Sequence, residues 1–307
     1  MVTTIDIHEL LSACVSLCDA ACGVIRDVQQ SRETGEPIGE TMKDPNDSKS
    51  YLTIADKRAQ QLIVDSLLQE WPGLAIVAEE EERDEGWEIP DLYRNCLVTG
   101  LDLGDLDGVK VGVLNRLPVP EELQDLPISE VCVFVDPVDG TREFVEGRLL
   151  SCQCLIGISV RGRSVAGVMG LPFHDRNQDN LPVELLSAAS GVRMYALGTE
   201  VRGIPRCEPP QHCVSVTSAN VKEEALIRAQ QAIDTAVNAG HGSHFIAGGC
   251  GNKILKLLTG EADVTLFNLG SSVWDTCATE AVLRAAGGQL TNIFGWPIDH
   301  QATSQQQ

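Results

Sequence analysis

The sequence predicts a mixed α/β protein built from stacked layers of helices and sheets. Segments with the period of an amphipathic helix alternate along the chain with short apolar runs that are typical of strands. Some of these runs follow one another across short turns, which predicts hairpins beside the helical crossovers. Of the 307 residues, 43% are hydrophobic, which is enough for one large core or two modest ones. These observations favour a layered α/β sandwich.

The N-terminal elements follow from hydrophobic periodicity. An apolar stripe with a spacing of three and four residues predicts a helix over residues 5–29. The polar stretch 30–50 contains Gly and Pro and is expected to be a loop. A second helix is expected over 54–70, and the apolar run at 74–78 is expected to be a strand that meets acidic residues at its end. Residues 81–130 give mixed signals and are expected to form surface helices and loops.

After residue 130 the chain reads as further strands and helices. Strands are expected over 131–137, 152–160, 164–173, 212–218 and 262–268, and a helix over 220–238. Residues 242–260 are expected to form a strand, a glycine turn and a helix, and residues 274–288 a helix that ends at its double glycine. We expect an N-terminal α+β subdomain over 1–205 and a C-terminal α/β subdomain over 206–307.

Composition limits the partners and the compartment. The chain carries 23 basic and 44 acidic residues, a formal net charge of −21, so attraction to nucleic acid or to an anionic membrane is not expected. An uninterrupted apolar run of membrane-spanning length is absent, and the acidic N-terminal start argues against a signal peptide. Eleven cysteines without a CxxC pair indicate a reduced, cytoplasmic protein. Nothing in the sequence indicates an obligate protein partner.

The stretch "VFVDPVDGTREF" carries the main chemical signal. Asp136 and Asp139 follow an apolar strand, separated by Pro137 and Val138. Two carboxylates at short range repel each other unless a proton or a cation lies between them. Together with the main-chain carbonyl of Val138 they offer hard oxygen ligands, which suit magnesium.

Other polar residues have a structural and a functional interpretation. Glu79 belongs to an acidic run that could simply be solvated, whereas Asp56 and Asp275 lie where a carboxylate caps a helix. The segment "GGCGNK", 248–253, opens a helix, where glycine amides and Lys253 could hold a phosphate. Taken alone, each of these signals is weak.

Together the motifs resemble those of a known family. The segments "VAEEE" (77–81), "VDPVDGT" (135–141) and "WDTCATEAVLRAAGG" (274–288) occur in the order typical of the lithium-sensitive, magnesium-dependent phosphatases of the inositol monophosphatase superfamily. The resemblance implies an αβαβα sandwich, a phosphomonoesterase activity and roughly two or three Mg²⁺ ions. It also implies a small phosphorylated molecule as substrate.

Within the superfamily, "TIADKRAQ" (53–60), the run 142–173 and "GGCGNKILKLLTGEAD" (248–263) are similar to the bisphosphate nucleotidase branch. The similarity implies removal of the 3′-phosphate of adenosine 3′,5′-bisphosphate to give AMP, with 3′-phosphoadenylyl sulfate as a second candidate substrate. Two alternatives stay open. One is an inositol polyphosphate 1-phosphatase, and the other is a non-catalytic metal or nucleotide sensor.

The resemblance also implies a role for each matching residue. The cation ligands would be Glu79, Asp136, the Val138 carbonyl, Asp139 and Asp275. Asp56 and Thr141 would orient and deprotonate the attacking water, and their presence disfavours the sensor. The substrate contacts would be Thr217, Asn220, Gly249 and Lys253. The segment around Asn220 departs from the branch, which carries Arg-Ser-His there, although an asparagine can still donate a hydrogen bond.

Overall fold

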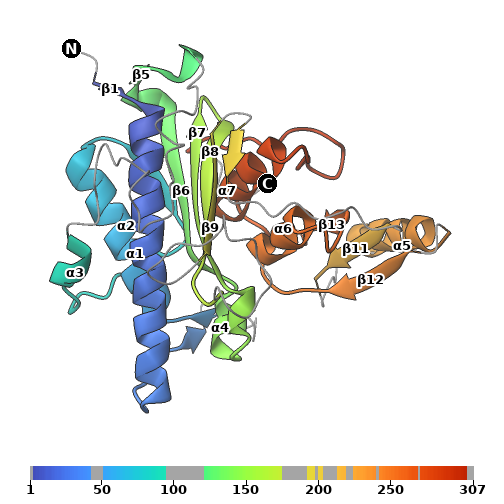
Figure 1. Cartoon of the computed structure of the whole chain (residues 1–307), viewed down its shortest axis with the longest axis horizontal. Helices are drawn as coiled ribbons and strands as arrows, with labels where there is room; N and C mark the ends of the chain where they lie inside the picture. The colour runs from blue at the N-terminus through green and yellow to red at the C-terminus, as the bar shows by residue number, and fades with distance from the viewer. Residues whose placement is uncertain are drawn as a thin grey trace.

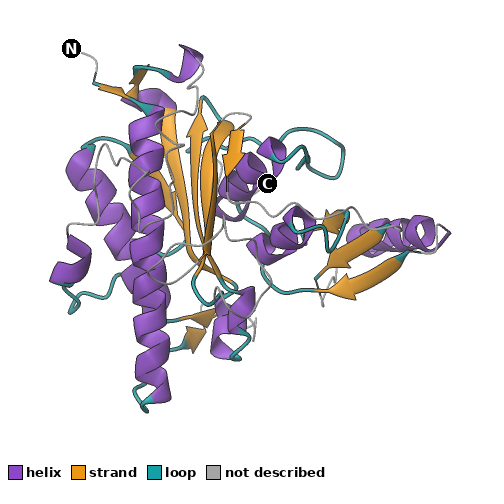
Figure 2. Ribbon diagram, viewed as in Figure 1, coloured by secondary structure: helices purple, strands orange, loops and turns teal. Residues whose placement is uncertain are grey.

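The computed structural model of the chain describes residues 3–42, 51–94, 121–174, 192–197, 200–202, 213–218, 224–239, 242–268 and 270–302. Figure 1 shows helices and sheets stacked across the molecule, and Figure 2 distinguishes them by colour. Across the view of Figure 1 lie α1 and α2, a large sheet, α7 and α6, a small sheet, and α5 at the outer end. The predicted αβαβα sandwich is therefore confirmed.

The large sheet has six strands in the order β10-β9-β8-β7-β6-β4. The bounds are β4 Ala75–Ala78, β6 Val131–Asp139, β7 Gln153–Val160, β8 Arg163–Leu171, β9 Val192–Leu197 and β10 Glu200–Arg202. Strands β6 to β10 form an antiparallel meander, and β4 pairs parallel to β6 at one edge. Strands β6 and β7 are buried along their whole length, because helices cover both faces of the sheet.

One face of the large sheet is covered by α1 (Ile7–Glu33) and α2 (Ile54–Glu70), as Figure 1 shows. Helix α1 is long and apolar enough to span a membrane by length and composition, but 78% of its most apolar window is buried inside the protein. Helix α2 has the predicted bounds. Helix α1 extends four residues beyond its prediction, because Arg32 donates hydrogen bonds to the carbonyls of Phe144 and Val145.

Helix α7 (Val273–Ala285) covers the opposite face of the large sheet. It approaches closely, because Gly157 of β7 and Gly167 of β8 have no side chains. A Cβ atom at Gly157 would lie 2.5 Å from the Ala278 nitrogen, and one at Gly167 would lie 2.7 Å from the Ala278 Cα. These two glycines therefore allow α7 to lie close against the sheet.

The small sheet has three parallel strands in the order β12-β11-β13: β11 Val214–Thr217, β12 Ser243–Ile246 and β13 Val264–Leu266. Its helices are α5 (Glu224–Ala239) and α6 (Cys250–Leu258). The predicted subdomain boundary at 205 and 206 lies outside the described residues and stays a prediction.

Short elements complete the described part of the chain. They are β1 Thr4–Ile5, β2 Thr41–Met42, β3 Tyr51–Leu52, β5 Leu126–Pro127, α3 Asp91–Arg94, α4 Thr141–Val145 and the 3-10 turns Glu121–Leu123, Ile128–Glu130 and Leu149–Ser151. Within the stretch 81–130, for which surface helices and loops are predicted, residues 95–120 lie outside the description.

Candidate metal centre and active site

The two aspartates of the opening motif lie on an irregular end of β6. The strand continues to Asp139, two residues beyond its predicted end. Asp136 pairs with Leu155 and Asp139 pairs with Gln153. Between these two pairs β6 advances by three residues and β7 by two, which is a β-bulge in β6. Such a bulge changes the direction in which side chains point. Both carboxylates are buried, with Asp136 2% and Asp139 5% exposed.

Two further carboxylates join this pair from distant parts of the chain. Glu79 follows β4, and its amide donates to the Val135 carbonyl over 3.0 Å, which extends the pairing of β4 with β6. Asp275 lies in the first turn of α7, where its Oδ2 accepts the Ser272 amide over 2.6 Å. Capping is therefore a correct interpretation of Asp275, and the same placement brings its carboxylate to the cluster.

The pKa values show how closely these acids interact. Burial, followed by the charges of Glu79, Asp139 and Asp275, raises the pKa of Asp136 well above its usual range. Burial and then the charges of Asp139 and Glu79 raise the pKa of Asp275 to about 7. The cluster therefore resists full ionisation unless a positive charge is supplied.

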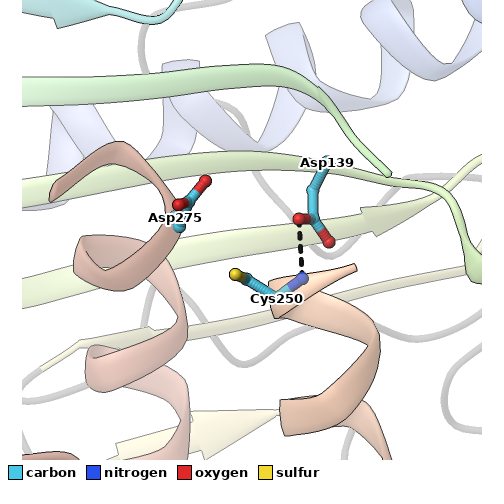
Figure 3. Close-up of side chains that lie close together, drawn as sticks. All are labelled: Asp139, Cys250 and Asp275. Atoms are coloured by element: carbon cyan, nitrogen blue, oxygen red, sulfur yellow. Dashed lines mark hydrogen bonds between the residues drawn. The ribbon is translucent and has the colours of Figure 1, made fainter. Parts of the chain in front are cut away.

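Asp139 contacts the N-terminus of α6. The Cys250 amide donates to Oδ1 over 2.8 Å (Figure 3). The Gly251 amide donates to Oδ2 over 2.8 Å. Burial raises the pKa of Asp139 to about 6, although the charge of Lys253 and these two amides oppose the rise. The helix start predicted to hold a phosphate therefore holds a carboxylate of the protein itself.

A second group of residues lies around Asp56, which is fully buried. Its Oδ2 accepts the Thr53 amide over 2.8 Å and the Thr53 hydroxyl over 2.5 Å, which forms the capping box of α2. Its Oδ1 lies 3.0 Å from the Thr141 hydroxyl, which is also 3.0 Å from the Val138 carbonyl. The structure thus brings together the two predicted catalytic residues and one predicted ligand.

Two of the predicted substrate residues lie at the carboxyl end of the small sheet. Thr217 ends β11 and is buried, and Gly249 follows β12 at the same carboxyl end of these parallel strands. Open α/β sheets bind ligands at this end. Lys253 is buried, and its Nζ donates to the Gly249 carbonyl over 2.7 Å. Asn220 lies outside the described residues, so its predicted role stays a prediction.

Sequence reasoning missed two residues beside the cluster, Cys250 and Gln153. In "GGCGNK" only the glycines and the lysine drew attention, yet the Cys250 Sγ and one oxygen each of Asp139 and Asp275 lie within 4.8 Å of one another (Figure 3). Gln153 is fully buried on β7, and neither polar atom of its side chain has a hydrogen-bond partner among the residues that the structure describes. A polar residue inside an apolar strand was the only signal for Gln153.

The donor set fits a hard divalent cation. Four carboxylates and a nearby main-chain carbonyl supply oxygen atoms, which are the ligands that magnesium prefers. Oδ1 of Asp136 is buried and receives no hydrogen bond from any residue within the described ranges, as expected of an oxygen reserved for a cation. The raised pKa values have the same cause, because acids gathered without a counter-charge hold their protons.

The family model described as the inositol monophosphatase family matches residues 6–305. The chain belongs to the inositol monophosphatase family. Members of this family are metal-dependent phosphatases, so the acidic cluster lies in a fold that employs metal ions. The resemblance found in the sequence motifs is confirmed.

Named relatives of the family agree with this result. The chain is 34% identical over 299 residues to 3′(2′),5′-bisphosphate nucleotidase 1 of Dictyostelium discoideum, covering 96% of this chain and 88% of that one. It is 29% identical over 250 residues to the rat protein of the same name, covering 81% and 73%. Among solved structures, extragenic suppressor protein suhB from Bartonella henselae superposes with a TM-score of 0.62 at 18% identity, covering 94% and 89%, which shows the shared fold.

Proposed function

We propose that this protein is a magnesium-dependent phosphomonoesterase that removes the 3′-phosphate of adenosine 3′,5′-bisphosphate to give AMP and phosphate. 3′-Phosphoadenylyl sulfate is a second candidate substrate. The choice of a nucleotide is supported by the relatives named bisphosphate nucleotidase, one of which is similar over 96% of this chain. The phosphatase chemistry is supported by the site itself.

One observation carries the proposal: Glu79, Asp136, Asp139 and Asp275 converge although the chain separates them widely. Asp136 and Asp139 are buried beside two half-buried carboxylates, and this arrangement costs free energy that packing alone does not recover. A binding function explains that cost, and the oxygen-only composition of the four acids favours Mg²⁺. We propose that these four residues and the Val138 carbonyl hold roughly two or three Mg²⁺ ions.

Magnesium supplies Lewis-acid stabilisation of phosphoryl oxygens and favours ionisation of a nearby water. The remaining steps belong to the protein. The Thr141 hydroxyl has one proton, so it can donate to Asp56 or to the Val138 carbonyl, but not to both at once. When it donates to Asp56, its oxygen keeps lone pairs that can accept a hydrogen bond from water.

Asp56 is then the acceptor toward which the water's proton moves through Thr141. The capping box of α2 holds Asp56 in place, because two donors of Thr53 bind its other oxygen. A base held in this way loses little entropy in the reaction. We therefore assign the orientation and deprotonation of the attacking water to Asp56 and Thr141.

We assign the substrate contacts to the carboxyl end of the small sheet, where Thr217 and Gly249 lie. Asn220 follows Thr217 in the sequence, and Lys253 follows Gly249. Lys253 is a buried cation 5.4 Å above the ring of Phe267. It is a charge partner for a substrate phosphate, once its hydrogen bond to Gly249 is exchanged.

The test is phosphate release measured side by side from adenosine 3′,5′-bisphosphate and inositol 1,4-bisphosphate, with magnesium and with or without lithium. We expect hydrolysis of the nucleotide, dependence on Mg²⁺ and inhibition by Li⁺. Faster release from the inositol phosphate would transfer the assignment to an inositol polyphosphate phosphatase. No release from either compound would refute the enzymatic proposal.

A further inference from the structure

A cysteine thiol lies among the candidate cation ligands. The Sγ of Cys250 and one carboxylate oxygen each from Asp139 and Asp275 lie within 4.8 Å of one another. Figure 3 shows the thiol between the two acids, which come from β6 and α7, while Cys250 itself opens α6. One sulfur and two oxygen atoms, each from a different secondary-structure element, therefore lie close together.

Both the main chain and the side chain of Cys250 make contacts that hold it in this position. Its amide donates to Oδ1 of Asp139, and its Sγ lies 3.3 Å from the hydroxyl of Ser271. The residue as a whole is half-buried. The thiol is thus held in a defined position within the cluster.

Three further polar atoms nearby point to a ligand. Oδ1 of Asp136 and both polar atoms of the Gln153 side chain are buried and have no hydrogen-bond partner anywhere in the described part of the chain. A Cβ atom at Gly251 would meet Gln153 Oε1 at 2.4 Å and Asp139 Oδ2 at 3.1 Å, so the Gln153 amide reaches the space beside Asp139. Buried polar atoms without partners are rare, and a bound ion or its water is a common reason for them.

We propose that Asp139, Cys250 and Asp275 form a mixed oxygen and sulfur site for a thiophilic divalent cation such as Zn²⁺ or Cd²⁺, which competes with Mg²⁺ for the two aspartates. Thiolate ligands select softer cations, whereas magnesium requires oxygen. The cation binding is independent of catalysis. Only its consequence, inhibition of phosphate release, rests on the proposed function.

The binding step is a ligand exchange without oxidation or reduction. A bond forms between the Cys250 sulfur and the cation, the S–H bond breaks, and the proton passes to water. Bonds of about 2.3 Å to sulfur and about 2.0–2.2 Å to oxygen place two ligands of one tetrahedral ion about 3.5 Å apart. Donors within 4.8 Å of one another reach that spacing by small side-chain rotations.

The first experiment is a titration of the metal-free protein with Cd²⁺ and with Co²⁺, followed by ultraviolet absorption. A thiolate bound to either ion gives a ligand-to-metal charge-transfer band. We expect a band in the parent protein and in Cys213→Ala, which removes an exposed thiol, but not in Cys250→Ala. Absence of the band from the parent, or its persistence in Cys250→Ala, would overturn the proposal.

A second variant, Cys250→Ser, controls for an effect of Cys250→Ala on folding. Cys250→Ser keeps a small side chain and an oxygen in place of the sulfur. We expect its Cd²⁺ affinity, measured by calorimetry, to fall roughly tenfold or more while its Mg²⁺ affinity changes by less than about threefold. An unchanged Cd²⁺ affinity in this folded variant counts against the site. Because absorption and calorimetry do not depend on turnover, they separate this result from failure of the phosphatase proposal.

Discussion

The hydroxyl of Thr141 lies 3.0 Å from a carboxylate oxygen of Asp56, although 85 positions separate the two residues. Asp56 lies in the first turn of α2 on one face of the large sheet, and Thr141 begins α4 just after β6. The contact links the cap of a helix to the end of the strand that carries Asp136 and Asp139. It joins the two residues to which we assign the orientation of the attacking water.

Replacement of Thr141 by valine tests this pair. Valine keeps the shape but has no hydroxyl, so no group can pass the water's proton toward Asp56. We expect kcat to fall by about 10²–10⁴-fold. Magnesium should still raise the Tm, because the four carboxylates are unchanged. Thr141→Ser keeps the hydroxyl and should retain most of the activity, so a parent-like kcat in Thr141→Val would refute the assignment.

Replacement of Asp136 by asparagine should abolish phosphate release and yet stabilise the metal-free protein. The pKa of Asp136 is raised, so this group favours folding only below its unfolded pKa and opposes folding once the pH exceeds its folded pKa. At about pH 8, we expect asparagine to increase the free energy of unfolding by about 1 kcal/mol or more. Chemical denaturation in EDTA measures this change.

The matched control for Asp136→Asn is Asp65→Asn. Asp65 also carries a carboxylate, but it pairs with Arg83 at the surface, where an ion pair contributes at most about 1 kcal/mol. We expect this control to retain phosphate release and to gain no stability in EDTA. If Asp136→Asn lowers the stability in EDTA, the carboxylates do not repel one another as the structure indicates.

The response to magnesium should depend on pH. Asp139 and Asp275 have pKa values of about 6 and about 7, both above the ordinary value of 3.8. Their contribution to stability is therefore present below pH 3.8 and is lost as the pH rises through 6 and 7. Because Mg²⁺ must displace these protons, the rise in Tm on adding Mg²⁺ should be small near pH 5 and large near pH 8. Thermal unfolding at both pH values checks this, and equal shifts would contradict the raised pKa values.

Gly249 tests how the start of α6 is coupled to the cluster. Its φ is +75°, and a Cβ atom there would lie 2.9 Å from Asp139 Oδ2. Gly249→Ala should cost about 1–3 kcal/mol of stability and also displace Asp139, lowering the Mg²⁺ affinity and kcat. Gly73→Ala is the control, because Gly73 has a φ of +96° but no atom within 4 Å of its Cβ position. It should lose similar stability and keep its kcat, and equal losses of kcat in both variants would remove the link to Asp139.

Local signals in the sequence were sufficient for much of the fold. Helix α2 has the predicted bounds, since its apolar period and its Thr53 cap are both local features. The strand before Glu79 was found for the same reason. The last turn of α1 was missed, because it depends on Arg32 reaching the carbonyls of Phe144 and Val145. No local pattern encodes such a contact.

The candidate site divides in a similar way. Residue types, their order and their resemblance to a family determined which carboxylates belong together, and the fold brings them together. Only the tertiary structure decided that Asp139 takes the first amides of α6, which a phosphate was expected to occupy, and that the thiol of Cys250 enters the cluster. The physical reason is that the sequence determines which ionisable groups are present. The neighbours of such a group, and hence its pKa and its ligands, depend on the packing of segments that are far apart in the sequence.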